Sequence, residues 1–133
     1  MDLAELTREA NELLAEGFNA IDQSWRDRCE IVPARDFQPL GALNIESYAH
    51  MISFSADEVA SGAYKASFRR LGRDAGSLFL RLFNERAGDG RAVVAYLEGT
   101  LTPQCTATQE ADGKYVVRCY HDFGIQKAQE VGV

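Results

Sequence analysis

The sequence is poor in cysteine and histidine, and the spacing of both excludes the common metal and disulfide frameworks. Its three cysteines, Cys29, Cys105 and Cys119, lie far apart and form no C-x-x-C pair, which argues against a zinc site and a disulfide framework. The two histidines, His50 and His121, are too widely separated for a short metal-binding motif. We therefore expect reduced thiols in a cytoplasmic protein, with no bound metal. A glycine-rich phosphate-binding loop is also missing, so we expect no cofactor.

Basic residues and long apolar runs are scarce as well. The chain has 14 Lys and Arg against 20 Asp and Glu, a net charge of −6, so we do not expect it to bind nucleic acid. No apolar run approaches the roughly 20 residues that span a membrane. The first residues, MDLAELTREAN, are typical of a charged helix rather than a signal peptide. With 133 residues, 46% of them hydrophobic, the chain is predicted to form a single domain over residues 1–133.

Two helices are predicted in the first half of the chain. Residues 2 to about 28 carry apolar side chains at three- and four-residue steps, and Asp2 with Glu5 suits an N-terminal capping box. A proline-containing loop follows over residues 30–43. The apolar pattern then predicts a second helix from Asn44 to about Ala60, with a restart where Ser55 and Glu58 form another capping-box pattern.

The second half of the chain is predicted to be a series of strands. The expected strands are Tyr64–Leu71, Ser77–Arg86, Arg91–Thr102, Cys105–Glu110 and Lys114–Phe123. Hairpin turns are expected at residues 87–90 and 111–113, because Asp-Gly supplies the positive φ that tight hairpins need. Two helices followed by a strand meander indicate an α+β fold, with helices on one face of an antiparallel sheet.

The order of these elements and the last strand resemble a known superfamily. A long first helix carrying Phe18 and Trp25 precedes a proline-containing loop, and the region of the last predicted strand has the sequence DGKYVVRCYHD over residues 112–122. In these features the chain resembles the SnoaL-like branch of the nuclear-transport-factor-2-like superfamily. The segment CEIVP over residues 29–33, with Pro39 and N-x-E-x-Y over residues 44–48, is similar to small fungal members. Those members act as isomerases or cyclases in polyketide and meroterpenoid pathways.

This resemblance implies a cone-like curved antiparallel sheet around an apolar cavity that the N-terminal helices close. Members of the superfamily include steroid isomerases, polyketide cyclases, scytalone dehydratase, limonene epoxide hydrolase and binding modules without catalysis. The fold alone does not choose among these activities. The partners that it implies are a hydrophobic small molecule and a second copy of the chain, which would form a homodimer through the exposed face of the sheet.

Glu98 is the first candidate catalytic residue. It shares a face of the predicted strand Arg91–Thr102 with Tyr96, and a carboxylate shielded from water there would have a raised pKa suited to proton transfer near neutrality. In the epoxide-hydrolase relatives this strand carries charged catalytic residues. The alternative is that this face points to solvent or to a dimer partner, with Glu98 a surface acid.

His121 is the second candidate, because an imidazole exchanges protons near neutral pH. It shares a face of the last strand with Val117 and Cys119, whereas Asp122 lies on the opposite face. Asp122 would therefore orient His121 only if the strand ended or bulged there. The relatives carry an acidic residue where Cys119 stands, which argues against epoxide opening by paired acids. The alternative is that His121 is a hydrogen-bonded wall residue.

The favoured function is that of a cofactor-free acid–base enzyme, an isomerase, cyclase or dehydratase acting on a hydrophobic polyketide or terpenoid intermediate. Glu98 would be the base, Tyr96 and His121 would donate or relay protons, and Asp122 would orient the strand end. The expected pocket residues are Phe18, Trp25, Tyr48, Val117 and Cys119. The alternative is a non-catalytic dimeric module that binds a lipophile or a protein, in which Leu78, Leu80 and Leu82 serve either the cavity or the interface.

Overall fold

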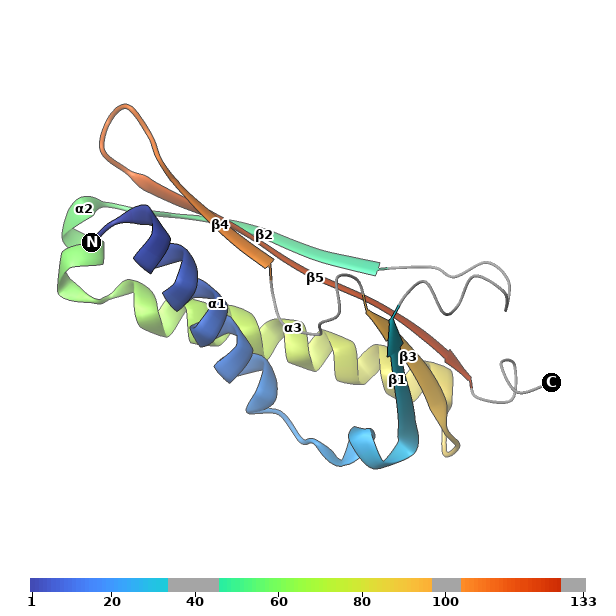
Figure 1. Cartoon of the computed structure of the whole chain (residues 1–133). Helices are drawn as coiled ribbons and strands as arrows, with labels where there is room; N and C mark the ends of the chain where they lie inside the picture. Colours follow the sequence, from blue (N-terminus) through green and yellow to red (C-terminus); the bar gives the residue numbers. More distant parts are fainter. Residues whose placement is uncertain (34–45, 97–103, 128–133) are drawn as a thin grey trace.

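The computed structural model describes residues 1–33, 46–96 and 104–127, with the backbone alone at residues 33, 46–48, 95, 96 and 122. It is an α+β structure in which helices cover one face of a sheet (Figure 1). This confirms the predicted α+β class. The elements in chain order are α1 (Leu3–Asn19), η1 (Ser24–Arg28), β1 (Cys29–Pro33), β2 (Glu46–Phe54), α2 (Ala56–Ser61), α3 (Tyr64–Ala87), β3 (Ala92–Tyr96), β4 (Gln104–Gln109) and β5 (Tyr115–Lys127).

The long strand β5 organises the sheet. β2 pairs with it antiparallel along residues 115–123, β4 pairs antiparallel with residues 115–120, and β3 pairs antiparallel with residues 123–127. β1 then joins β3 in a parallel pair, so residues 30–33, expected in the proline-containing loop, are part of the sheet. β2 therefore follows one edge of β5, while β4 and β3 follow each other along the opposite edge.

Helices α1 and α3 touch each other through their backbones. A methyl group added at Gly17 would overlap the carbonyl oxygen of Arg69, and one added at Gly72 would overlap the carbonyl oxygen of Leu14. Because neither position has room for a Cβ atom, glycine is required where these two helices cross. The crossing holds α1 beside α3 on the inner face of the sheet (Figure 1).

The buried side chains form two clusters, and α3 contributes to both. The first lies where α1 and the first half of α3 meet β4 and the start of β5, and it includes Leu14, Phe68 and Cys119. The second lies toward the other end of α3 and includes Trp25 and Phe79. A single helix therefore connects the two ends of the core.

The predicted helix over residues 44–60 is wrong for residues 46–54, which form β2. Phe54 is buried and Ile52 packs against the first cluster, whereas Met51 and Ser53 are exposed. That alternation has the period of a strand. Apolar residues four positions apart, such as Tyr48 and Ile52, fit both a helix and a strand, which is why the apolar pattern indicated a helix here. The expected restart is confirmed, because Ser55 and Glu58 form the capping box of α2.

The two strands predicted over residues 64–71 and 77–86 are also wrong, because residues 64–87 form the single helix α3. Its buried residues Phe68, Ala75, Phe79 and Phe83 recur at four- and seven-residue steps, which is the period of a helix face. The expected hairpin at residues 87–90 is instead the end of this helix. Gly88, with φ of 59°, terminates α3 and leads into β3.

The remaining elements agree with the sequence more closely. α1 begins at the predicted N-cap, where Asp2 accepts a hydrogen bond from the backbone N–H of Glu5 at 2.7 Å, but the helix ends at Asn19 rather than near residue 28. The predicted strands Cys105–Glu110 and Lys114–Phe123 are confirmed as β4 and β5. The turn between them contains Gly113, with φ of 92°. The strand predicted at Arg91–Thr102 is seen as β3, and residues 97–103 lie outside the described part of the chain.

Candidate functional site

His121 lies on the inner face of β5 and is 2% exposed. Val117, Cys119 and Phe123 are buried on the same side, while Arg118 and Tyr120 are exposed, as strand alternation requires. Among the described residues, His121 is the one buried residue that does not belong to the hydrophobic and aromatic types or to glycine. Burying an imidazole costs free energy unless its surroundings compensate, so its position in the core is a feature to explain.

The His121 ring is stacked on an aromatic ring from α1. Its centroid lies 5.5 Å from that of Phe18, and the two rings are inclined by 18°. Phe18 in turn lies 5.6 Å from Phe79. The Trp25 and Phe123 rings each meet the Phe79 ring edge-on, with centroids 4.6 Å and 5.1 Å from that of Phe79. We call Phe18, Trp25, Phe79 and Phe123 the aromatic cluster.

The structure thus brings together three of the residues predicted from the sequence, Phe18, Trp25 and His121. Phe79 and Phe123, which are not among the predicted site residues, complete the cluster. The predicted strand over residues 77–86 conceals the place of Phe79 on a helix face. The helical spacing of Phe68, Phe79 and Phe83 on one face of α3 was the signal that could have found it.

Trp25 supplies a second polar group within this apolar region. The side chain is 1% exposed, and its Nε1 atom is buried with no hydrogen-bond acceptor in the described part of the chain. The Arg26 guanidinium lies over the ring, 4.7 Å from its centroid, a favourable contact with the face of an indole. A buried N–H donor without an acceptor is destabilising by itself, and this one could donate a hydrogen bond to the carbonyl oxygen of a bound molecule.

Val117 and Cys119 lie further along the same inner face of β5, but in the first core cluster rather than beside the aromatic cluster. Cys119 faces Cys105 of β4. The two neighbouring thiols perturb each other: Cys119, together with burial, raises the pKa of Cys105, whereas Cys105 lowers the pKa of Cys119 despite its burial.

The other predicted residues are placed by their backbones or not at all. The sheet register sets Tyr48 opposite His121 and Tyr96 opposite Phe123. β5 continues through Asp122, which pairs with Ser47, so the strand does not end there. Glu98 lies outside the described residues. The catalytic roles of Glu98, Tyr96 and Asp122 therefore stay predictions.

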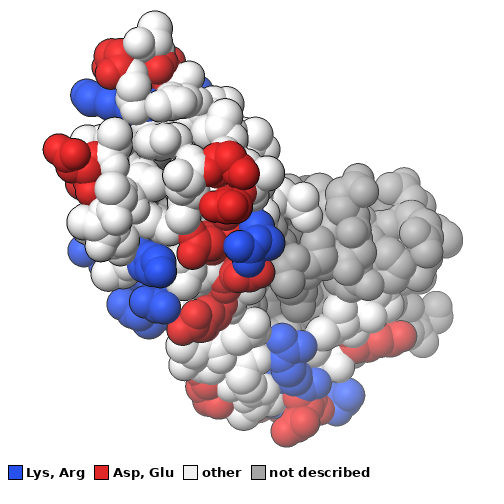
Figure 2. All heavy atoms as spheres, turned by 60° about the vertical axis from the view of Figure 1, so that its left-hand side comes forward, with Lys and Arg blue, Asp and Glu red and all other residues white. Residues whose placement is uncertain are grey.

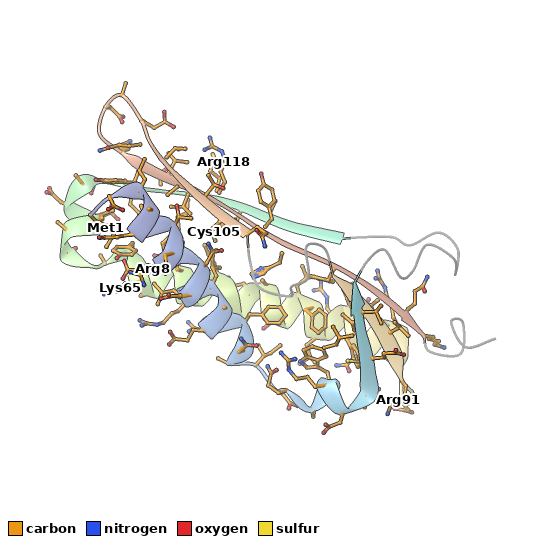
Figure 3. All side chains as sticks on the ribbon, in the orientation of Figure 1. Met1, Arg8, Lys65, Arg91, Cys105 and Arg118 are labelled. Carbon is orange, nitrogen blue, oxygen red and sulfur yellow. The ribbon has the colours of Figure 1, made fainter. Side chains whose placement is uncertain are left out.

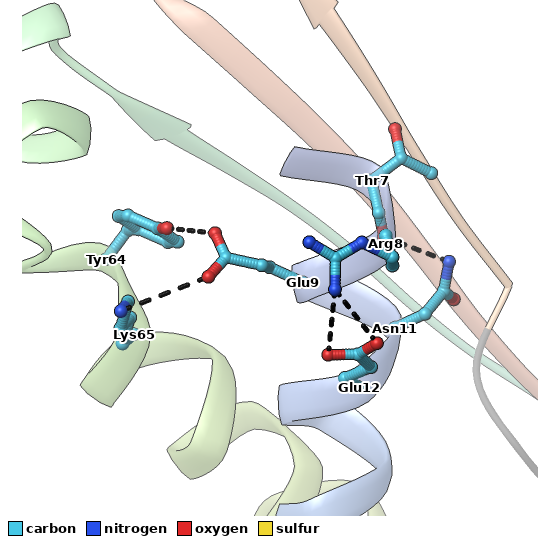
Figure 4. Close-up of polar contacts among 7 residues, drawn as sticks. All are labelled: Thr7, Arg8, Glu9, Asn11, Glu12, Tyr64 and Lys65. Carbon is cyan, nitrogen blue, oxygen red and sulfur yellow. Dashed lines mark hydrogen bonds and ion pairs between the residues drawn. The ribbon is translucent and has the colours of Figure 1, made fainter. Parts of the chain in front are cut away.

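The polar contacts at the helix crossing are structural. Glu9 of α1 accepts a hydrogen bond from the Tyr64 hydroxyl and lies 3.9 Å from the Lys65 ammonium of α3 (Figure 4). Burial, together with this hydrogen bond, raises the pKa of Tyr64 to about 12. Arg8 and Glu12 form an exposed pair at 3.2 Å along α1. These contacts connect α1 to α3 or to itself, away from the aromatic cluster.

The outer face of the sheet bears an open depression of about 310 Å³, lined by Ala49, His50, Met51, Arg118 and Tyr120. Met51 is 63% and Tyr120 is 44% exposed. On the face shown in Figure 2, acidic and basic side chains are interspersed rather than segregated. Leu78, Leu80 and Leu82, expected on a strand to serve either the cavity or the interface, lie on α3 instead, where Leu80 and Leu82 pack against the second core cluster.

Comparison with protein-family models, curated proteins and solved structures finds no match to this chain. In the described part of the chain, no helix has both the length and the apolar character needed to cross a membrane. Within those same ranges, no three side chains of His, Cys, Asp or Glu lie close enough together to hold a metal ion.

Proposed function

We propose that the chain is a cofactor-free acid–base enzyme that acts on a hydrophobic, carbonyl-bearing small molecule. The observation that carries this proposal is the burial of His121 against Phe18 on the inner face of the sheet. An ionisable side chain held in an aromatic interior is typical of sites that move protons on apolar substrates. The SnoaL-like cone, with its cavity on this face of the sheet, is part of the same proposal.

The chemistry would be the transfer of a proton next to a carbonyl group. A base removes the proton α to the carbonyl, the electron pair of that C–H bond moves to the carbonyl oxygen, and a hydrogen-bond donor stabilises the enolate. We assign the base to Glu98 and the donor or relay to His121 with Tyr96. The buried N–H of Trp25 is available to orient the ligand oxygen. Return of the proton to another carbon completes an isomerisation, and attack of the enolate on a second carbonyl completes a cyclisation.

A second candidate function is binding without catalysis, in a dimer formed through the outer face of the sheet. The exposure of Met51 and Tyr120 around the open depression favours it. Large apolar side chains gathered on an otherwise polar sheet face are often covered by a partner.

The two functions are separated by deuterium exchange into 2-tetralone, a hydrophobic ketone with acidic α protons, followed by proton NMR in D₂O. We expect the protein to accelerate exchange beyond an equal concentration of free imidazole. His121→Gln and Glu98→Gln should each lower the acceleration by about 100-fold or more, as the loss of a general acid or base does.

The matched control is Tyr120→Phe, which changes the neighbouring residue on the exposed face of β5. It should leave exchange unchanged, and circular dichroism should show that every variant is folded. Exchange no faster than with imidazole would refute the enzymatic proposal. Saturable quenching of Trp25 fluorescence by 2-tetralone in the absence of exchange would favour the binding module instead.

A further inference from the structure

We propose that Cys105 and Cys119 form a peroxide-sensitive dithiol that closes to a reversible disulfide and ties β4 to β5. The inference stands on the strand register and on the contact between the two thiols. It does not depend on the proposed enzymatic function. Figure 3 marks the position of Cys105 on β4.

The strand register places the two cysteines directly opposite each other. Cys105 and Cys119 are Cα partners in the antiparallel pairing of β4 with β5. The backbone N–H of Cys105 does not bond to β5, because it donates to Oδ1 of Asn11 in α1 at 3.0 Å. The pair therefore occupies a non-hydrogen-bonded position, where opposed Cα atoms lie about 4.5 Å apart. That separation is at the lower end of the range of about 4.4–6.8 Å that disulfides span.

The thiols already interact within the core. Cys105 is 7% and Cys119 is 3% exposed. The neighbouring Cys105 thiol holds the pKa of Cys119 below its ordinary value, whereas the pKa of Cys105 is raised by the neighbouring Cys119 and by burial. Since the thiolate is the reactive form of cysteine, Cys119 is the attacking sulfur and Cys105 the resolving one.

The third cysteine provides an internal comparison. Cys29 of β1 is partly buried, and its Cα partner across the strand pair is Ala92. Burial raises the pKa of Cys29, which lowers its thiolate fraction near neutral pH. The register thus gives Cys29 no opposing thiol with which to form a disulfide.

The oxidant is a small hydroperoxide such as hydrogen peroxide. The Cys119 thiolate attacks one peroxide oxygen, so that an S–O bond forms, the O–O bond breaks and hydroxide leaves as water with the thiol proton. The Cys105 sulfur then attacks the sulfenic sulfur of Cys119. The S–S bond forms, the S–O bond breaks, and the Cys105 proton leaves with hydroxide as a second water. Two thiols are oxidised by two electrons and one peroxide is reduced to two waters. A dithiol reductant reverses the change by exchange.

Peptide mapping of the full-length chain tests the inference. The folded protein is treated with hydrogen peroxide, unfolded in urea with iodoacetamide and digested with trypsin. The three cysteines fall in the separate tryptic peptides 29–35, 92–114 and 119–127. We expect peptides 92–114 and 119–127 to be joined by a disulfide, peptide 29–35 to be alkylated, and dithiothreitol to restore alkylation of all three.

Two variants complete the test. Cys29→Ala should leave the cross-linked peptide unchanged, and Cys119→Ala should abolish it, with Cys105 recovered alkylated. If Cys119→Ala does not fold, the wild-type map still decides. The inference is overturned if both peptides of the native chain are recovered alkylated, if Cys119 is recovered as sulfinic acid, or if Cys29 cross-links as readily as the pair.

Discussion

Tyr64 is the residue whose ionisation is most clearly coupled to the fold. Its ring is buried between Phe54 and Phe68, and its hydroxyl donates a hydrogen bond to Glu9. Burial and the nearby carboxylate both oppose formation of the phenolate, so the pKa rises from 10.0 to about 12. The neutral phenol is thus one of the groups that hold α1 on α3.

We predict that part of the stability of the protein is lost as pH rises from about 10 to about 12, between the unfolded and folded pKa values of Tyr64. In that window the unfolded chain has released the phenol proton while the folded chain still holds it, so raising the pH favours unfolding. Urea unfolding at several pH values measures the loss. Tyr64→Phe removes the ionising group, so the variant should lose less stability than the wild type over this window. An equal loss in both would contradict the assignment.

At the scale of elements, the crossing of α1 and α3 depends on two glycines. Gly17→Ala or Gly72→Ala would drive a methyl group into a backbone carbonyl of the facing helix, and neither backbone can move without disturbing the core. Overpacking typically lowers the free energy of unfolding by about 1–3 kcal/mol. Because these methyl groups would clash with backbone atoms, we expect losses at the upper end of that range.

Gly90→Ala is the matched control, because its Cβ would lie 3.4 Å from the nearest heavy atom, the Ala87 carbonyl oxygen. We expect the free energy of unfolding of this variant to lie within about 0.5 kcal/mol of the wild-type value, as for most surface substitutions. Urea denaturation followed by circular dichroism measures all three variants. If Gly17→Ala were as stable as the wild type, the helices would not be in backbone contact.

The same glycines explain why sequence patterns located some elements and not others. α1, β4 and β5 were predictable because each has a capping residue, a turn or an unbroken apolar period. α3 was not, because Gly72 and Gly76 interrupt its apolar face and are favourable only once α1 is packed against them. Leu78, Leu80 and Leu82 add an alternation that imitates a strand. Burial of Phe18 and Trp25 could be expected from the apolar spacing of the first segment, and that of His121 from the alternation along the last strand. The contact of Phe79 with Phe123 could not, because it depends on where α3 crosses the sheet.

At the scale of the whole molecule, α3 and β5 each run through both core clusters. Neither cluster can lose its packing without uncovering side chains on the same helix and strand. Shared elements of this kind favour a single cooperative transition.

We predict that two local probes will report the same unfolding curve. Trp25 fluorescence reports the second cluster, and reaction of Cys105 and Cys119 with a thiol reagent reports the first. In the Cys29→Ala background, both should give the same urea midpoint and slope. Phe68→Ala and Phe79→Ala change one residue in each cluster. Each variant should shift the unfolding midpoint seen by both probes equally and lower the free energy of unfolding by about 3–5 kcal/mol. Separate midpoints would show two independent folding units.

The outer edge of β4 is completed by side chains of α1. Asn11 accepts a hydrogen bond from the N–H of Cys105, and Thr7 accepts one from the N–H of Ala107 at 3.2 Å. These partners are separated by 94 and 100 positions in the chain. During synthesis α1 can pack on α3 before β4 exists, but the strand that Asn11 and Thr7 close is made much later, so this part of the core stays incomplete until then. Such distant pairing slows folding, and this interval is when we expect the nascent protein to depend most on chaperones.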